Sequence, residues 1–144
     1  MANKKKNKYK NNKNNIRSKT ELKPITKNMD LLYMTTAEIR AKDMANLFQE
    51  NEKCKVELWD EMNVLELELP NTNYVDFESL EVNFSDLALL ENMNIQTAFA
   101  IRLKEEDYST ALLYFKQIQE AFGGFICADT EDFSPIYVGT LDQA

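Results

Sequence analysis

Acidic side chains cluster at two points of the sequence where they could bind a divalent cation. Asp129, Glu131 and Asp132 share one turn, and the acidic run 105–107 precedes a helical pattern. Carboxylates that converge at strand ends can hold Mg²⁺ for phosphoryl-transfer or nuclease chemistry. The alternative is a solvated turn and a helix N-terminus, where acids complement the helix dipole. A two-metal site normally needs a nearby Lys or Arg, and residues 28–144 have only seven. The sequence therefore favours the solvated turn and predicts neither a metal nor a cofactor.

Histidine is absent from the chain, and there are only two cysteines. The lack of histidine excludes Ser-His-Asp and Cys-His catalytic groups and removes the commonest metal ligand. Cys54 and Cys127 have neither zinc-like nor CxxC spacing, and Cys127, in the apolar run 125–128, is predicted to be a buried, inert thiol. We therefore expect no catalytic residues and no enzymatic activity.

Glutamates alternate with apolar residues in two neighbouring strand candidates. Glu57 lies in the first, Glu66 and Glu68 lie in the second, and Asp60 and Glu61 lie at the tip between them. This pattern is typical of the polar face of an exposed sheet. Because like charges on neighbouring strands repel each other, a dense acidic face with few lysines also indicates a cationic partner. A basic protein surface would fit such a face directly, in the manner of a nucleic-acid mimic.

Residues 1–27 are rich in asparagine and lysine and have a net charge of +9, with Glu21 as the one acid. Candidates for phosphate contacts in this arm are Lys4, Lys5, Lys6, Lys8, Lys10, Lys13 and Arg17. The arm has too few apolar residues to form a core, so we expect it to be disordered when free. It could bind nucleic acid by releasing counterions, it could be a solubilising tail, or it could fold back on the acidic body.

Residues 28–144 form the body, with a net charge of −16. Charge opposition on this scale bears on partners and solubility, not on the fold. The body also has aromatic residues near acidic ones, which together could line a cavity for a small cationic ligand. Core packing is the alternative for these residues, which are Tyr33, Trp59, Tyr74, Tyr108 and Tyr114.

Apolar periodicity predicts an alternation of strands and helices in the body. The expected strands are 29–34, 54–59, 64–69, 95–103, 125–128 and 136–138. A capping box at Thr35–Glu38 would begin one helix that runs to about Glu50, and Asp107 would cap a second helix over 108–122. Between them, 74–84 is expected to form one bent or two short strands with a bulge near Glu78, and 85–91 a short helix.

Two stretches, about 29–69 and 95–139, share the order strand, helix, strand, turn, strand. The sequence therefore predicts one α+β domain over 28–144, with a mostly antiparallel sheet and two main helices on one face. A ferredoxin-like sandwich and a tandem βαββ arrangement both fit this order.

From Thr97 to Pro135, a strand, a helix that ends in Gly123-Gly124, a strand and an acidic turn at Asp129 follow one another. This quarter of the chain resembles the C-terminal domain of the ZipA division-protein family, a resemblance that implies peptide binding on a sheet face. The same elements recur in many split βαβ domains, and the chain has no segment like that family's membrane anchor, so we assign no family.

No apolar run approaches the roughly 18 residues of a membrane span, and no apolar segment of a secretory signal follows the first lysines. We therefore expect a cytoplasmic protein without membrane contact. The leading hypothesis is a non-enzymatic protein-binding module, an inhibitor or immunity-type factor with an acidic binding face. The alternatives are a nucleic-acid-associated protein that uses the arm and an acidic metal-dependent or small-ligand domain.

Overall fold

The computed structural model describes residues 27–49, 55–81 and 92–140. The arm residues 1–26, Cys54 and the helix expected over 85–91 lie outside this part. In chain order, the elements are β1 (Asn28–Thr35), α1 (Ala41–Gln49), β2 (Lys55–Trp59), the 3₁₀ turn η3 (Asp60–Met62), β3 (Val64–Glu68), β4 (Tyr74–Leu80), β5 (Thr97–Lys104), η4 (Glu105–Asp107), α3 (Tyr108–Phe122), β6 (Phe125–Ala128) and β7 (Ile136–Val138).

Seven strands form one sheet in the order β2-β3-β4-β5-β1-β6-β7, and every neighbouring pair is antiparallel. The predicted α+β class with a mostly antiparallel sheet is therefore confirmed. The two stretches that share one element order do not form separate sheets, because β1 pairs with β5 and β6 of the second stretch. β4 lies outside both stretches and joins them by pairing with β3 and β5.

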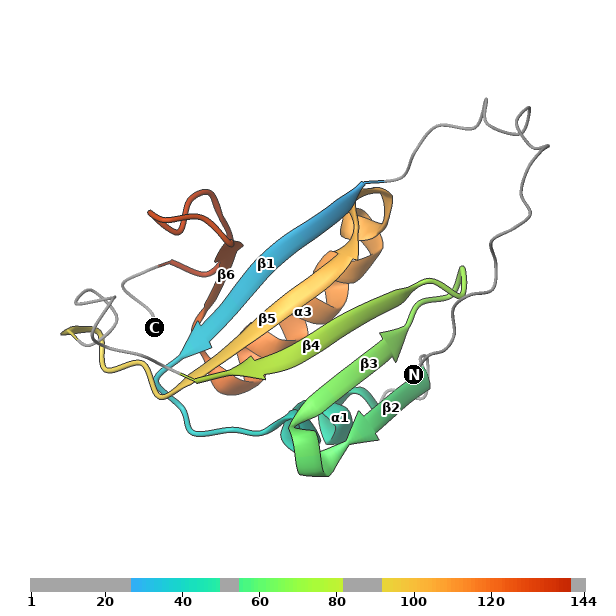
Figure 1. Cartoon of the computed structure of the whole chain (residues 1–144), viewed down its shortest axis with the longest axis horizontal. Coiled ribbons are helices and arrows are strands. Elements are labelled where there is room, and N and C mark those ends of the chain that lie inside the picture. Colours follow the sequence, from blue (N-terminus) through green and yellow to red (C-terminus); the bar gives the residue numbers. More distant parts are fainter. Residues whose placement is uncertain (1–26, 50–54, 82–91, 141–144) are drawn as a thin grey trace, which may run out of the picture.

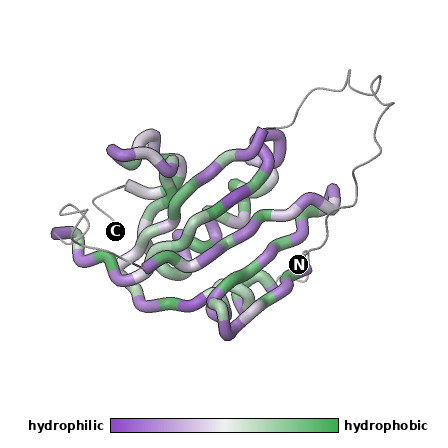
Figure 2. Tube along the Cα trace, viewed as in Figure 1, coloured by the Kyte–Doolittle hydropathy of each residue, from purple (hydrophilic) through white to green (hydrophobic). Residues whose placement is uncertain are grey.

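The two helices α1 and α3 lie on the same side of the sheet, behind it in the view of Figure 1. Along β3 and β4, more buried and less buried residues alternate, and hydrophobic and hydrophilic residues alternate with them (Figure 2), so the hydrophobic set of these strands points to the helices. Phe48 of α1 and Phe115 of α3 both pack against Phe77 of β4, with ring centroids 6.3 Å apart in each pair. The main core therefore lies between the helices and one sheet face.

A smaller apolar cluster lies on the opposite face of the sheet, at one end. Met34 of β1 and Cys127 of β6 are buried there beneath Phe133, which is 5 % exposed. Phe133 comes from the loop between β6 and β7, so this loop covers only that end of the face. The rest of the face, which we call the open face, has no helix packed on it among the described elements.

The predicted capping box at Thr35 is wrong. Thr35 ends β1, and its hydroxyl donates to the carbonyl oxygen of Phe122 (2.8 Å) instead of capping a helix. Helix α1 begins only at Ala41. The intervening residues are held by Thr97 of β5, whose hydroxyl accepts from the backbone N of Ile39 (3.1 Å) and donates to the carbonyl of Ala37 (2.7 Å).

The expected bulge near Glu78 is also absent, because β4 pairs in register with β3 and with β5 across it. Leu80, which changes the apolar parity of the sequence, is 42 % exposed and does not belong to the core. The register shift that does occur lies between Ile126 and Cys127, where β6 pairs with β7.

No helix in the described part of the chain is long and apolar enough to cross a membrane.

Candidate binding face

The open face carries a row of charged side chains that crosses five strands. Strand register places Glu57 of β2 beside Glu66 of β3, Glu66 beside Asp76 of β4, Asp76 beside Arg102 of β5, and Arg102 beside Asp30 of β1. Neighbouring strands in a sheet lie about 4.8 Å apart, so these side chains are close neighbours. We call these five residues the acidic row.

Arg102 is the one cation in the acidic row, and it lies at the Asp30 end. Its Nε donates to Oδ1 of Asp30 over 2.8 Å, although both side chains are at least half exposed. This hydrogen bond, helped by the charges of Asp76 and Glu78, raises the pKa of the Arg102 guanidinium. The arginine therefore neutralises one end of the row and leaves the other end, at Glu57 and Glu66, without a cation.

Glu66, in the middle of three neighbouring acids of the row, has a perturbed carboxyl group. Its pKa is raised, first because partial burial removes water from the carboxylate, and next by a side-chain hydrogen bond with Asp76. Such a bond between two carboxyls requires one of them to be protonated. The charges of Asp76, Glu57 and Glu68 raise the pKa further, because each of them disfavours a second negative charge.

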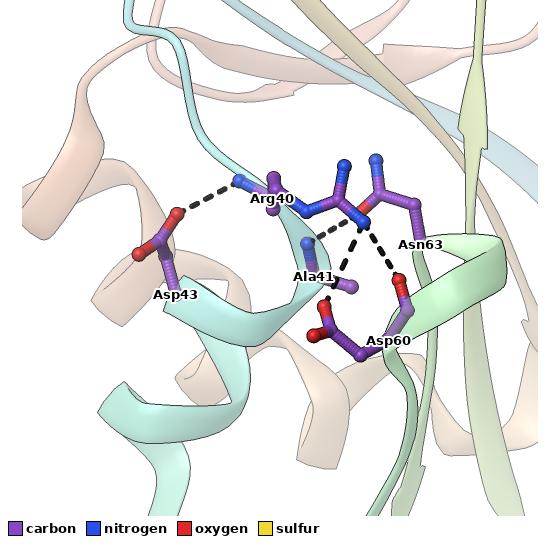
Figure 3. A network of polar contacts seen from close by, with 5 residues as sticks. All are labelled: Arg40, Ala41, Asp43, Asp60 and Asn63. Carbon is purple, nitrogen blue, oxygen red and sulfur yellow. Dashed lines mark hydrogen bonds and ion pairs between the residues drawn. The ribbon is translucent and has the colours of Figure 1, made fainter.

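The structure brings together three of the five acids predicted for the binding face, Glu57, Glu66 and Glu68. Glu68 lies next to the acidic row and opposite Lys55. Asp60 and Glu61 instead lie in η3 at the hairpin tip, where Asp60 Oδ1 is 3.6 Å from Nη2 of Arg40 (Figure 3). The hairpin tip thus contributes to the N-terminal end of α1.

Asp30, Asp76 and Glu78 belong to the open face but were not predicted as site residues. The sequence pattern does indicate the positions of Asp76 and Glu78, since they alternate with Val75 and Phe77 at the two-residue period of a half-buried strand. Asp30 could not be found this way, because its place follows only from the pairing of β1 with β5.

Two of the shallow hollows along the open face are lined by several of its acids. One, of about 260 Å³, surrounds Ala100 and is lined by Asp30, Asp76, Glu78 and Asp129. The small side chain of Ala100 leaves room here. The other hollow, of about 240 Å³, lies between Lys55, Glu57, Glu66, Glu68 and Tyr74.

The predicted aromatic residues divide into two groups. Tyr33 and Tyr114 are buried in the main core, and Tyr108 is half-buried against it. Trp59 and Tyr74 are 38 % and 48 % exposed, at the ends of β2 and β4. These two share the open face with the carboxylates, and an exposed aromatic ring beside carboxylates attracts Lys and Arg side chains.

The acids considered for a metal site do not converge. No three Asp, Glu or Cys side chains in the described ranges are placed to hold one ion. Asp132 Oδ1 accepts from the hydroxyl of Thr130 (3.0 Å) and from the backbone N of Ser134 (3.2 Å). These hydrogen bonds lower the pKa of Asp132, while Asp129 and Glu131 are exposed in the same turn.

Asp107 has a structural role that differs from the predicted one. It is 3 % exposed and makes no side-chain hydrogen bond that caps α3. Its two carboxylate oxygens accept from the side-chain amides of Asn71 (2.8 Å) and Asn73 (2.9 Å). Asp107 therefore holds the β3–β4 turn against the start of α3.

Cys127 is buried and free, and burial raises the pKa of its thiol to about 12. A buried thiol with a raised pKa is unreactive, as the sequence predicts for Cys127.

Comparison of the chain with protein-family models, with curated proteins and with solved structures finds no match.

Proposed function

We propose that this protein is a non-enzymatic binding module that covers a basic surface of a partner protein with its open sheet face, acting as an inhibitor or immunity-type factor. The observation that carries the proposal is the acidic row, in which Glu57, Glu66 and Asp76 stand side by side on three neighbouring strands. Like charges placed directly opposite each other destabilise a sheet. A face that served only solubility would do so better with both signs interspersed.

Lys55 lines the same hollow as Glu57 and Glu66, but in the described part of the chain no ion pair within 4 Å joins a cation to Glu57, Glu66 or Asp76. The two ion pairs in that part of the chain join Arg40 to Asp60 and Arg102 to Asp30. A basic partner would supply the missing cations, and its charges would return the pKa of Glu66 toward the ordinary value. Association therefore relieves a cost that is present in the free protein.

Charge reversal tests the proposal. In the full-length chain, the triple variant Glu57→Lys, Glu66→Lys and Glu68→Lys should slow association with the natural partner roughly tenfold or more at low salt and flatten its salt dependence, because exposed charges act mainly on the on-rate. The matched control is Glu38→Lys, Glu61→Lys and Glu120→Lys, which reverses three exposed acids away from the open face.

The partner is identified by affinity capture from nuclease-treated lysate of the native cell, and association is then followed by surface plasmon resonance over a series of salt concentrations. Equal association rates for the two triple variants would contradict the proposal. Retention that disappears with nuclease, or with replacement of the arm lysines by glutamine, would point instead to nucleic-acid binding by residues 1–27.

A further inference from the structure

The two edges of the sheet differ in how far they are protected. Strand β7 has three residues, and its pairing with β6 contains a register shift. Strand β2 has five residues that pair with β3 without interruption. Its outer side has no neighbouring strand in the described part of the chain. Short strands and irregular pairing are how proteins guard sheet edges against a further strand, so β7 is guarded and β2 is open.

The side chains of β2 continue the main core on one face of the sheet and the acidic row on the other face. Val56 and Leu58 are half-buried and pack at the margin of the main core. Glu57, between them, points to the opposite face and ends the acidic row. A strand laid against β2 would therefore meet Val56 and Leu58 on one face, and Glu57 flanked by Lys55 and Trp59 on the other.

From this combination we infer that β2 is where the partner docks, by adding an extended strand to the sheet edge. The inference rests on the proposed function and specifies its partner. The incoming strand carries a Lys or Arg beside Glu57 and apolar residues at the two adjacent positions, which lie beside Val56 and Leu58. Backbone hydrogen bonds to β2 provide the affinity, and the alternating side chains provide the specificity.

A second copy of the chain fits this edge poorly. In an antiparallel pair of two β2 strands centred on Glu57, the two Glu57 carboxylates would lie opposite each other. The pairing would also join two acidic rows end to end, and like charges in that position destabilise a sheet. Charge complementarity therefore selects a basic strand from a different protein.

The lysine-rich segment 4–10 of the chain's own arm meets only half of the requirement. An extended segment 4–10 places lysines at positions 4, 6, 8 and 10 on one side, but Lys5, Asn7 and Tyr9 on the other. That second side has one aromatic residue and no aliphatic residue to pair with Val56 and Leu58. A partner strand that alternates basic and apolar residues satisfies both faces.

Two synthetic peptides test the inference against the full-length protein. The first peptide alternates Lys and Val over seven residues. The second has the same sequence with alternate backbone nitrogens methylated, so that it keeps its charge but one edge of the peptide strand has no N–H donors for pairing. We expect the first peptide to slow hydrogen exchange at the backbone amides of 55–59. Methylation should weaken binding roughly tenfold or more, because several backbone hydrogen bonds are lost. Glu57→Lys should abolish binding, whereas Glu120→Lys, at an exposed position of α3, should not change it.

The outcomes separate this inference from the proposed function. Equal binding of the two peptides that still depends on Glu57 would overturn strand addition and leave the acidic-face proposal standing. Binding that depends on neither Glu57 nor Glu66 would overturn both. Slow exchange without peptide at those amides of 55–59 that point away from β3 would also overturn the inference. Protection from exchange that increases with protein concentration would mean that a second copy occupies the edge. Protection that is lost when the arm lysines are replaced by glutamine would mean that the arm occupies it.

Discussion

Glu66 has three acidic neighbours on the open face, and their charges repel its carboxylate. It has Glu57 on one side and Asp76 on the other, and Glu68 follows two positions along the same strand. A carboxyl group whose pKa is higher in the folded than in the unfolded state binds its proton more tightly when folded. At a pH where both states are ionised, such a group therefore lowers the free energy of unfolding.

The sign of the pH dependence follows from this shift. We expect Glu66→Gln to raise the free energy of unfolding at pH 7 by a few tenths of a kcal/mol, the scale of a cross-strand charge pair. The gain should shrink as pH falls through the raised pKa of Glu66 and vanish below the ordinary glutamate pKa, where the wild-type carboxyl is protonated in both states. Urea titrations at a series of pH values measure this difference.

Glu61→Gln is the matched control, since it removes an exposed glutamate from the hairpin tip and should change stability little at any pH. A loss of stability at pH 7 in Glu66→Gln would mean that the row does not repel, and the main argument for a cationic partner would fail.

Among the elements, the start of α1 shows how the hairpin and a helix depend on each other (Figure 3). The side-chain oxygen of Asn63, in the β2–β3 turn, accepts from the backbone N of Ala41 over 2.6 Å. Asp43 Oδ2 accepts from the backbone N of Arg40 (2.8 Å), and Nη2 of Arg40 donates to the carbonyl of Asp60 (2.6 Å). Backbone donors at the helix start are thus satisfied partly by a turn about 20 residues away along the chain.

Asn63 also has a left-handed backbone, with φ of 58°, so two substitutions separate its two roles. Asn63→Gly keeps the conformation but loses the hydrogen bond to Ala41, and we expect it to cost about 1 kcal/mol. Asn63→Ala loses the same hydrogen bond and must also adopt a conformation that a side chain with a Cβ disfavours, for a total of about 2 kcal/mol or more. Chemical denaturation of the two variants and the wild type measures both. If Gly and wild type are equally stable, the hydrogen bond to Ala41 contributes nothing.

The elements also show where sequence patterns succeed. The helix over 108–122 and the strands 125–128 and 136–138 match their predicted bounds, because each depends on local periodicity and nearby turn residues. Thr35 and Asp107 were misassigned for the opposite reason. Their side chains bond to Phe122, 87 residues away, and to Asn71, 36 residues away. Thr35-x-x-Glu38 carries the pattern of a capping box whether or not its hydroxyl has a better partner elsewhere.

The candidate site was predicted in part for the same reason. The alternation of Glu66 and Glu68 with Leu65 and Leu67 places both acids on one face within a single strand. Arg102 joins the acidic row because β5 pairs with β4. Asp30 completes the row only because β1 pairs with β5 across more than 60 residues of chain. Strand order over such distances is set by the whole core and has no local sequence pattern.

At the scale of the whole molecule, the charge is divided between the arm and the body, at +9 and −16. We expect deletion of residues 1–25 to leave the melting temperature nearly unchanged, because this segment has too few apolar residues to contribute much to a core. Differential scanning calorimetry at low and at physiological salt measures this. A loss of several degrees that disappears at high salt would mean that the arm docks on the acidic body, so that a partner would have to displace it.

The unlike edges of the sheet have a consequence for stoichiometry. A strand added to β2 finds a regular edge, but the opposite end of the sheet stops at a three-residue strand with shifted register. A sheet that can be lengthened at one end only has a valency of one. Binding by that end would give discrete one-to-one complexes and would terminate, where a protein with two open edges would pass from dimers to filaments.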